Sequence, residues 1–570
     1  MGPGRRRSLT SHEVDDLAAV LAADLQRVDD RRARGVFFTP SDIAERLTAL
    51  ALDPTNGSTD GSTSGTVADP ACGAGVFLLA AGRLLVDQGV ADPATVVRRH
   101  LFGADIDPAS VEATRRLLAT WAGIEPGEVA GVVVGDPLHH GRDVWAGCPG
   151  GGATTGFDAV VGNPPFLGQL RASTVVSAAD RKRLRYRFPG LVAAYTDVAW
   201  LFLAAGLDLL ADGGRMVLIQ PQSVLAARDA GPVRDLVVST ARLAGIWWDR
   251  SEVFAGHTEV CAPVVERSPC GRGPLLERPV EVFVDREVVI AGRSPEPAVG
   301  ETWGGVLASV LGVPPGVPSG GGATTGGSIG TMGAVTAGFR QHFYGLVTGV
   351  VERSGPDDPR PSMVTTGSVD PLHLRWGDRL CRFDGRRWQA PVVDLDAVTA
   401  GDPEVGRWFA ERRRPKLLVA SQTAVVEVVV DQTGDLVPVT PLIVIEPVAL
   451  EPVGRGRETD IEVLWRLAAA LSAPSITALA VRRSLGAARS SGRLRLSAVQ
   501  VSDLPLPTDA GAWDEGTALA RTLHRSSGAP AASDTWRAFG RVMAAAYGVV
   551  DPEAVATLVD WWWSRHPASR

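Results

Sequence analysis

The stretch VADPACGAGVFLLAAGRLL, residues 67–85, carries the clearest signal of the fold. A short apolar run ends at Asp69, a turn carries Gly73 and Gly75, and an apolar helix pattern follows. Glycines let the backbone of a turn approach a ligand closely, and the first turn of a helix presents N–H groups without intrahelical partners. The stretch therefore predicts a strand, a tight turn and a helix, with a ligand site at the turn.

The acid in this stretch indicates the kind of ligand. A dinucleotide site would show the spacing GxGxxG, whereas here two glycines follow an acid that lies four residues before Gly73. A carboxylate favours a cationic amino-acid group over a phosphate, and this points to S-adenosylmethionine. On this stretch alone, a purely structural strand, turn and helix is the alternative.

Two further apolar runs also end in acids. In LFGADIDPASVEATRRLL, residues 101–118, Asp105 ends the run, where a carboxylate can accept both hydroxyl groups of a ribose. Asp107 precedes a proline and is better explained as a helix N-cap. In VVVGDPLH, residues 132–139, Asp136 is placed to accept the exocyclic amine of an adenine ring. Each acid alone fits a cap or a ligand equally well, but three in order behind a glycine turn favour a ligand site.

Before residue 312, short apolar runs alternate with amphipathic stretches. We predict strands at residues 66–68, 100–104, 131–134, 159–161, 215–220, 244–248 and 280–284. We predict helices at residues 41–51, 76–88, 108–121, 197–210 and 231–240. This alternation predicts an α/β fold with a doubly wound, mostly parallel sheet, which binds ligands at the carboxyl ends of its strands.

The stretch FDAVVGNPPFLG, residues 157–168, places an asparagine, two prolines and an aromatic residue directly after another apolar run. Prolines fix φ and stiffen the turn, so the Asn163 amide oxygen and the Pro164 carbonyl can converge as two acceptors. Two acceptors suit a planar NH2 group whose nitrogen must become nucleophilic, because accepting both hydrogens localises its lone pair. Phe166 offers a face on which the ring that bears the amine can stack. A structural turn with a core phenylalanine is the alternative.

With these motifs the chain resembles the gamma-class adenine-specific DNA methyltransferases, the modification enzymes of restriction and phage-defence systems. The matching segments are RGVFFTP (34–40), DPACGAG (69–75), GADID (103–107), GDP (135–137) and NPPF (163–166), followed by residues 195–225 and 245–260 in the order that the family uses. The resemblance implies a class I S-adenosylmethionine-dependent methyltransferase domain. It implies cofactor binding by Thr39, Pro40, Asp69, Gly73, Gly75, Asp105 and Asp136. It implies catalysis by Asn163, Pro164 and Phe166.

The same resemblance and the composition predict five segments. They are an N-terminal helical segment (1–30), the methyltransferase domain (31–290), a Gly/Pro-rich linker (291–335), a mixed α+β target-recognition domain (336–508) and a helical C-terminal segment (509–570). Only about 34 residues precede the first matching motif, so we expect no nuclease domain in this chain. No second aromatic residue is found at 262–267 to complete a sandwich around a base.

The overall composition excludes several classes of protein. The chain has 570 residues, of which 45% are hydrophobic and 21% charged, as in soluble globular proteins. Its five cysteines form no CxxC pair, which argues against a zinc ribbon and a disulfide framework, and we expect no metal. The longest apolar run, residues 198–210, is too short to span a bilayer. We therefore expect a cytoplasmic protein without a membrane partner.

The expected macromolecular partner is double-stranded DNA with a flipped target adenine, because a base in a duplex must leave the stack to be methylated. The net charge of −7 gives no general attraction to nucleic acid, so DNA contacts must come from local patches. Residues 336–508 contain 21 Lys and Arg against 20 Asp and Glu, but some of the basic residues form clusters. The candidate nucleic-acid contacts are Arg340, His342, Arg413, Lys416, Arg482, Arg483 and Arg493.

The leading hypothesis is methyl transfer from S-adenosylmethionine to adenine N6 in DNA, with restriction or defence-system subunits as further partners. One alternative is methylation of a protein glutamine, whose side chain presents the same planar NH2 group. Others are methylation of an RNA base and a modification subunit that needs a partner for DNA specificity. A non-catalytic scaffold is disfavoured, because every position that the chemistry needs, from Asp69 to Phe166, is intact. The recognised DNA sequence and the oligomeric state stay open.

Overall fold

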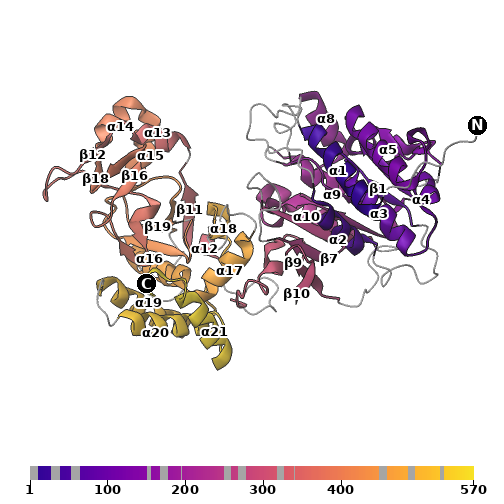
Figure 1. Cartoon of the computed structure of the whole chain (residues 1–570). Coiled ribbons are helices and arrows are strands. Elements are labelled where there is room, and N and C mark those ends of the chain that lie inside the picture. The colour runs from indigo at the N-terminus through magenta and orange to yellow at the C-terminus, as the bar shows by residue number, and fades with distance from the viewer. Residues whose placement is uncertain are drawn as a thin grey trace, which may run out of the picture. The chain divides into compact units, whose positions relative to one another are not determined.

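The structure is a computed structural model. It describes residues 10–26, 39–52, 65–149, 156–166, 178–193, 196–249, 259–267, 278–316, 327–338, 340–420, 422–448, 459–485, 494–526 and 532–569. The chain folds as two compact units, Met1–Val310 and Leu311–Arg570 (Figure 1). The boundary between the units falls inside the segment that we predicted as a linker, and the five predicted segments stay a prediction.

A ten-stranded sheet forms the centre of the first unit. Its strands are β1 (Val67–Asp69), β2 (Leu101–Asp105), β3 (Val132–Val134), β4 (Phe157–Gly162), β5 (Leu210–Leu218), β6 (Gln220–Pro221), β7 (Arg242–Trp248), β8 (Val260–Glu266), β9 (Val280–Val284) and β10 (Val289–Ser294). The order across the sheet is β10-β9-β7-β8-β5-β4-β1-β2-β3, with β6 paired to β8. The neighbouring strands β3, β2, β1, β4 and β5 run parallel to one another. β8 is antiparallel to β5 and β7. The direction of winding reverses between β1 and β4, which makes this the point where such sheets bind ligands.

Helices cover this sheet in two groups. They are α1 (Ser11–Gln26), α2 (Ser41–Ala51), α3 (Val76–Asp87), α4 (Pro93–Arg99), α5 (Pro108–Ala122), α6 (Pro137–His140), α8 (Ala178–Arg187), α9 (Val198–Leu209), α10 (Gly231–Thr240) and α11 (Gly304–Leu307). One buried cluster joins α1, α2, α3 and α5 to alternate strand residues such as Ala159, Val161 and Val217. The second group contains α9, which packs against β4, β5, α6 and α10. The doubly wound, mostly parallel α/β fold that the sequence predicted is therefore confirmed.

Short-range sequence signals explain where several of these helices begin. The side chains of Asp92, Asp107 and Asp197 each accept a hydrogen bond from a backbone N–H group in the first turn of α4, α5 and α9. Proline occupies the first position of α4 and α5, where its missing N–H group costs nothing. The prediction that Asp107 is a helix N-cap is confirmed, because it accepts from Ala109 N at 3.0 Å.

The second unit contains two four-stranded sheets and two hairpins. The first sheet has the order β11 (Gly333–Ala337), β22 (Ile443–Pro447), β19 (Lys416–Ala420) and β20 (Glu427–Asp431). The second sheet has the order β12 (Val350–Glu352), β18 (Pro391–Val393), β13 (Ser362–Val364) and β21 (Leu436–Pro438). The hairpins pair β14 (Val369–Asp370) with β15 (His373–Leu374), and β16 (Cys381–Phe383) with β17 (Arg386–Trp388).

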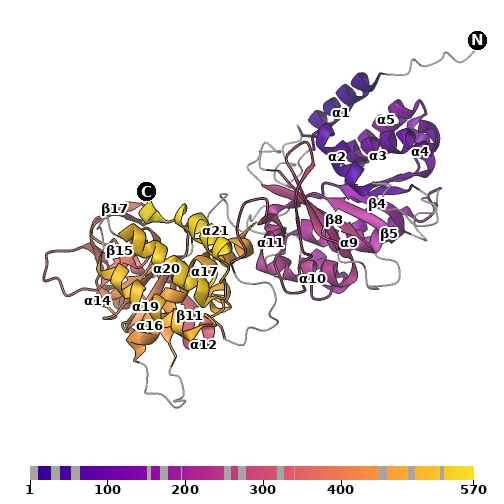
Figure 2. The same cartoon turned by 90° about the horizontal axis from the view of Figure 1, so that it is seen from below.

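Helices complete the second unit and form a layer at its C-terminal end. They are α12 (Ile329–Met332), α13 (Arg340–Leu346), α14 (Leu395–Gly401), α15 (Pro403–Glu411), α16 (Asp460–Ser472), α17 (Pro474–Ser484), α18 (Ala498–Ser502), α19 (Ala510–Arg525), α20 (Ala532–Ala546) and α21 (Pro552–Trp563). Figure 2 shows α16, α19 and α20 side by side, and α20 also packs against α21. Within the described parts of the chain, no single helix is long and apolar enough to cross a membrane, and only α16 and α17 together, bent by 61°, reach that length and composition.

Candidate active site

Four polar residues from four separate motifs come to one edge of the first unit's sheet. Strands β4, β1, β2 and β3 are adjacent and parallel, so their carboxyl ends lie along the same edge. The polar residues at or just beyond these ends are, in spatial order, Asn163, Asp69, Asp105 and Asp136. The sheet topology therefore brings together the residues that the sequence predicted as one site, and it places Asn163 and Asp69 at the reversal point.

Asp69 is the most deeply buried acid of this group, with 1% of its surface exposed. One of its carboxylate oxygens accepts a hydrogen bond from Ala71 N at 3.0 Å. Burial, with a smaller contribution from the negative charge of Asp105, raises the pKa of Asp69 to about 8. A cation close to this carboxyl group would stabilise its ionised form, so the site favours a positively charged ligand group.

Two glycines around this acid occupy positions where a side chain would not fit. Gly162 ends β4 with φ of +152°, and a Cβ atom there would lie 2.5 Å from Asp69 Oδ1. Gly75 precedes α3 in the left-handed conformation, and a Cβ atom there would lie 2.9 Å from Thr114 Cγ2. Thr114 also donates from Oγ1 to Gly73 O at 2.8 Å. No pattern in the sequence indicated this role of Thr114, because it lies inside α5.

Asp105 ties the end of β2 to the glycine turn. Its Oδ2 accepts from Gly73 N at 3.0 Å, and its Oδ1 accepts from Asp107 N at 2.9 Å. A carboxylate has about four acceptor positions, and these two bonds use two of them. Binding of a ribose at this strand end stays a prediction.

Asp136 serves as the N-cap of α6. Its Oδ1 accepts from Leu138 N at 3.0 Å and from His139 N at 3.3 Å, and its Oδ2 lies 2.6 Å from His139 Nδ1. The sequence left a cap and a ligand as equal explanations of this acid, and the cap is present. The additional contact of Asp136 with an adenine amine stays a prediction.

Asn163 follows β4 and lies beside the residues that lead into α2. Its Nδ2 donates to Oγ1 of the buried Thr39 at 3.2 Å, which joins positions 124 residues apart in the chain. Pro40 follows Thr39 and directly precedes α2. Because the amide nitrogen of Asn163 faces Thr39, its amide oxygen faces away from that residue. The orientation of Asn163 is therefore fixed by a residue that the resemblance assigned to cofactor binding.

The next residues of the NPPF motif are Pro164, which is buried, and Phe166, which is half-buried. Phe166 packs against the buried cluster that includes α2 and α3. This packing is what the structural alternative expected, and it leaves the residue only partly buried. Stacking of a base on Phe166 stays a prediction.

Neither a metal site nor a reactive cysteine is evident within the described ranges. No group of three or more His, Cys, Asp or Glu residues there could hold a metal ion. Cys72 lies in the glycine turn, and burial raises its pKa well above the ordinary value of a thiol. This cysteine is therefore a packed thiol and no nucleophile. Cys270 lies outside the described residues.

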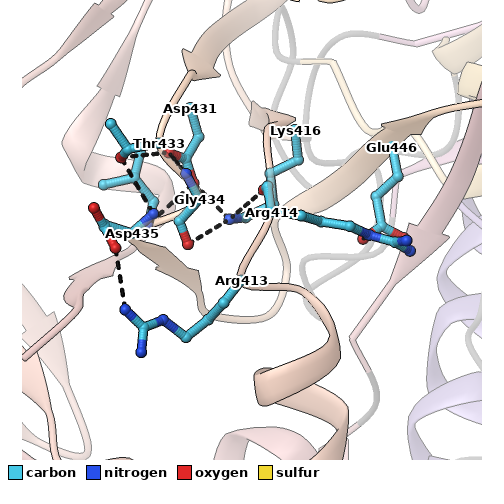
Figure 3. Close-up of polar contacts among 9 residues, drawn as sticks. Arg413, Arg414, Lys416, Asp431, Thr433, Gly434, Asp435 and Glu446 are labelled. Carbon is cyan, nitrogen blue, oxygen red and sulfur yellow. Dashed lines mark hydrogen bonds and ion pairs between the residues drawn. The ribbon is translucent and has the colours of Figure 1, made fainter. Parts of the chain in front are cut away.

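In the second unit, the structure corrects one predicted DNA contact. Lys416 has 0% of its surface exposed, and its Nζ lies 2.5 Å from Asp431 Oδ2 on the neighbouring strand (Figure 3). Burial lowers the pKa of Lys416, and the charge of Asp431 opposes this shift. Lys416 therefore holds β19 to β20 in the interior and has no surface for a phosphate.

The other predicted DNA contacts differ in where they lie. Arg413 is partly exposed and pairs with Asp435 at 3.1 Å, and Arg482 and Arg483 are half-buried near the end of α17. The His342 ring stacks on Trp408 with 4.0 Å between ring centroids, and burial together with the positive charge of Arg412 lowers its pKa. The side chain of Arg340 and all of Arg493 lie outside the described residues. Contact of these residues with DNA stays a prediction.

Comparison with known proteins gives one family match. The model of the family described as N-6 DNA Methylase matches residues 24–264, which include every predicted cofactor and catalytic residue. A comparison of the sequence with curated proteins gives no match.

Solved structures similar to this chain include the type IIL restriction–modification enzyme MmeI in complex with DNA, at 12% identity, with 99% of this chain and 80% of that chain covered and a TM-score of 0.51. The type IIG restriction endonuclease BpuSI has 14% identity, covers 97% of this chain and 69% of its own, and has a TM-score of 0.43. A type I restriction–modification methyltransferase subunit from Streptococcus thermophilus has 18% identity. The match covers 52% of this chain and 57% of that subunit, with a TM-score of 0.34. At 12% identity, the similarity to MmeI is one of fold.

Proposed function

Residues 24–264 belong to the N-6 DNA methylase family, and from this premise we propose how the residues at the sheet edge carry out methyl transfer. The chain is an S-adenosylmethionine-dependent methyltransferase for adenine N6 in DNA. The observation that supports the assignment of roles is the spatial order of Asn163, Asp69, Asp105 and Asp136 along one edge of the sheet. A nucleoside with an attached amino acid would extend along that order, with its amino-acid end on the Asn163 side.

The groups at this edge fit the cofactor by their chemistry. Asp69 holds the amino group of the methionine part, because a cation stabilises the ionised form of this buried acid. Asp105 accepts the ribose hydroxyl groups, and Asp136 accepts the adenine amine alongside its cap bonds. Gly73 and Gly75 keep the turn free of side chains. Thr39 and Pro40 border the site on the side of Asn163. When bound, S-adenosylmethionine supplies a methyl group on a positively charged sulfur.

Catalysis rests on two acceptors and one ring. The Asn163 amide oxygen and the Pro164 carbonyl accept the two hydrogens of the target amine, which localises the nitrogen lone pair and stabilises the charge that develops on attack. The bond from Asn163 Nδ2 to Thr39 Oγ1 fixes the amide before the substrate arrives, so no reorganisation is needed in the transition state. Phe166 supports the target ring, which must leave the duplex to reach this edge.

We place the enzyme in restriction–modification or phage defence, in the cytoplasm, and assign DNA reading to the second unit. The structural match to MmeI covers 99% of this chain, and MmeI is described as a restriction–modification enzyme in complex with DNA. Within the second unit, Arg413, Arg482, Arg483 and the surface near His342 are the proposed DNA contacts. Restriction or defence-system subunits are proposed as further partners.

The test of this function identifies the methylated product. Purified protein and tritiated S-adenosylmethionine are incubated in parallel with unmethylated genomic DNA, total RNA and a protein extract, and the digested products are separated. We expect label in N6-methyladenine from DNA. Label confined to RNA or to glutamine would contradict the DNA assignment, and label in DNA only after a partner subunit is added would make the chain a modification subunit.

A further inference from the structure

The segment after the NPPF motif has a charge that the rest of the first unit does not share. Residues 167–187 contain six Lys and Arg against one Asp, a balance of +5. Residues 1–310 as a whole contain 30 Lys and Arg against 37 Asp and Glu, so the first unit without this segment has a net charge of −12. The positive charge is therefore a local feature on an otherwise acidic unit.

Most of this charge lies on α8, labelled in Figure 1, with the sequence AADRKRLRYR. Leu184 and Phe188, four residues apart, are each only 4% exposed and anchor the helix to the unit. The residues on the outer side of α8, namely Lys182, Arg183, Arg185 and Tyr186, are exposed. The buried anchors therefore turn a basic face towards solvent.

Acids of the protein neutralise only part of this face. Arg183 lies 3.6 Å from Asp180, and Arg187 lies 3.4 Å from Asp208. Lys182 and Arg185 form no ion pair with any of the described residues. Like charges three and four residues apart on a helix cost roughly 0.2–0.5 kcal/mol per pair, so an anion bound here would remove a repulsion that is built into α8.

The position of α8 connects this face to the methyl-transfer site. α8 packs against α6, and α6 begins at Pro137, directly after Asp136 at the end of β3. α6 has four residues and is therefore about 6 Å long. The contact places part of α8 within about one helix diameter of the sheet edge that carries the site.

We propose that the basic face of α8, formed by Lys182, Arg183, Arg185 and Tyr186, binds backbone phosphates of the DNA substrate on the Asp136 side of the sheet edge that carries the methyl-transfer site. Arg and Lys neutralise phosphates, and the hydroxyl group of an exposed tyrosine can donate to a phosphate oxygen. This inference rests on the proposed function. It gives the first unit phosphate contacts of its own, separate from the recognition of the DNA sequence by the second unit.

The test compares two double variants of equal charge change. Lys182→Gln with Arg185→Gln removes two charges from the proposed face, and Arg99→Gln with Arg116→Gln removes two exposed charges from α4 and α5. Binding of full-length protein to a random-sequence duplex of about 30 base pairs is measured by fluorescence anisotropy over a range of salt concentrations. Each phosphate contact contributes about 0.9 to the slope of log K against log salt. We expect the α8 variant to lower the magnitude of this slope by about 1.8 and the α4/α5 variant to leave it unchanged.

Two further readouts separate a DNA contact from damage to the enzyme. The α8 variant should keep the wild-type affinity for S-adenosylmethionine and the wild-type kcat at saturating DNA, while its KM for DNA rises. A wild-type slope in the α8 variant, or an equal loss in both variants, would overturn the proposal while the methyltransferase function stands. Failure of the wild-type protein to methylate DNA would instead overturn the proposed function.

Discussion

The carboxyl edge of the first unit's sheet and the basic run at residues 412–416 in the second unit both contain residues that were predicted from sequence as functional, and they differ in outcome. At the sheet edge, residues from four motifs lie side by side. In the basic run, neighbouring side chains diverge. Figure 3 shows Lys416 directed to Asp431 and Gly434, Arg414 directed to Glu446, and Arg413 directed to Asp435.

The difference shows which kind of sequence pattern predicts that side chains meet at one site. Parallel strands deliver their carboxyl ends to one edge, so the order of motifs in a doubly wound chain fixes which residues meet. A run of basic residues fixes nothing of this kind, because partners on other elements decide which of its side chains are buried. In this run only Lys416 belongs to β19, and residues 412–415 precede the strand. The register of β19 with β20 places Lys416 opposite Asp431.

The largest expected effect that sharpens this comparison is on Lys416. Lys416→Met leaves Asp431 buried without its cation, and removal of one partner of a buried ion pair costs about 3–5 kcal/mol. We expect the urea-unfolding transition of the second unit, followed in the full-length chain, to shift by that free energy. The slope of DNA binding against salt should stay at the wild-type value.

The matched control is Arg413→Met, since the side chains of Arg413 and its partner Asp435 are 43% and 59% exposed. This variant should cost much less, because an exposed ion pair contributes about 0–1 kcal/mol. Equal and small effects in both variants, together with a weaker salt dependence for Lys416→Met, would return Lys416 to the list of DNA contacts.

The next effect concerns Asp69 and pH. The pKa of Asp69 is raised to about 8 in the folded protein without cofactor. Between about pH 4 and pH 8 the folded protein therefore keeps a proton on Asp69 that the unfolded chain has already released. The contribution of Asp69 to stability therefore falls as the pH rises across this interval. A cofactor cation that stabilises the ionised form should instead bind more tightly as the pH rises towards 8, by up to about tenfold per pH unit.

Calorimetric titration with S-adenosylmethionine at pH 6, 7 and 8, in buffers of different ionisation enthalpy, measures this dependence and the proton released. Asp69→Asn is the control, because it removes the carboxyl proton and leaves the titration of the cofactor itself. A pH dependence of binding that is the same in both proteins would contradict the contact between Asp69 and the cofactor's amino group.

The smallest effect is expected at Arg413, an exposed member of the basic run. Arg413→Ala breaks an exposed pair with Asp435 and should change the free energy of unfolding by less than about 1 kcal/mol. If it contacts a phosphate as proposed, the slope of DNA binding against salt should fall by about 0.9. Asp435→Ala, which breaks the same pair and keeps the arginine, should leave that slope unreduced. A slope unchanged in Arg413→Ala would remove it from the DNA contacts.

Much of the first unit could be predicted from sequence because its signals are local. The helices α2 and α10 have the predicted bounds, and the strands that carry the four polar residues were all located. β8 was missed because Pro263 interrupts its apolar run, which ordinarily argues against a strand inside a sheet. α8 was missed because its basic sequence has almost no apolar periodicity. The bond between Asn163 and Thr39 and the burial of Lys416 depend on tertiary contacts that no local pattern shows.

The most direct test of the account is single-turnover methyl transfer to DNA by Asn163→Ala, combined with its affinity for S-adenosylmethionine. The account predicts cofactor affinity close to wild type and a rate of adenine methylation lower by about 10²–10³-fold or more, as for loss of one preorganised group that stabilises developing charge. A variant that binds the cofactor and methylates adenine at the wild-type rate would contradict the central claim that Asn163, at the end of β4, activates the target amine.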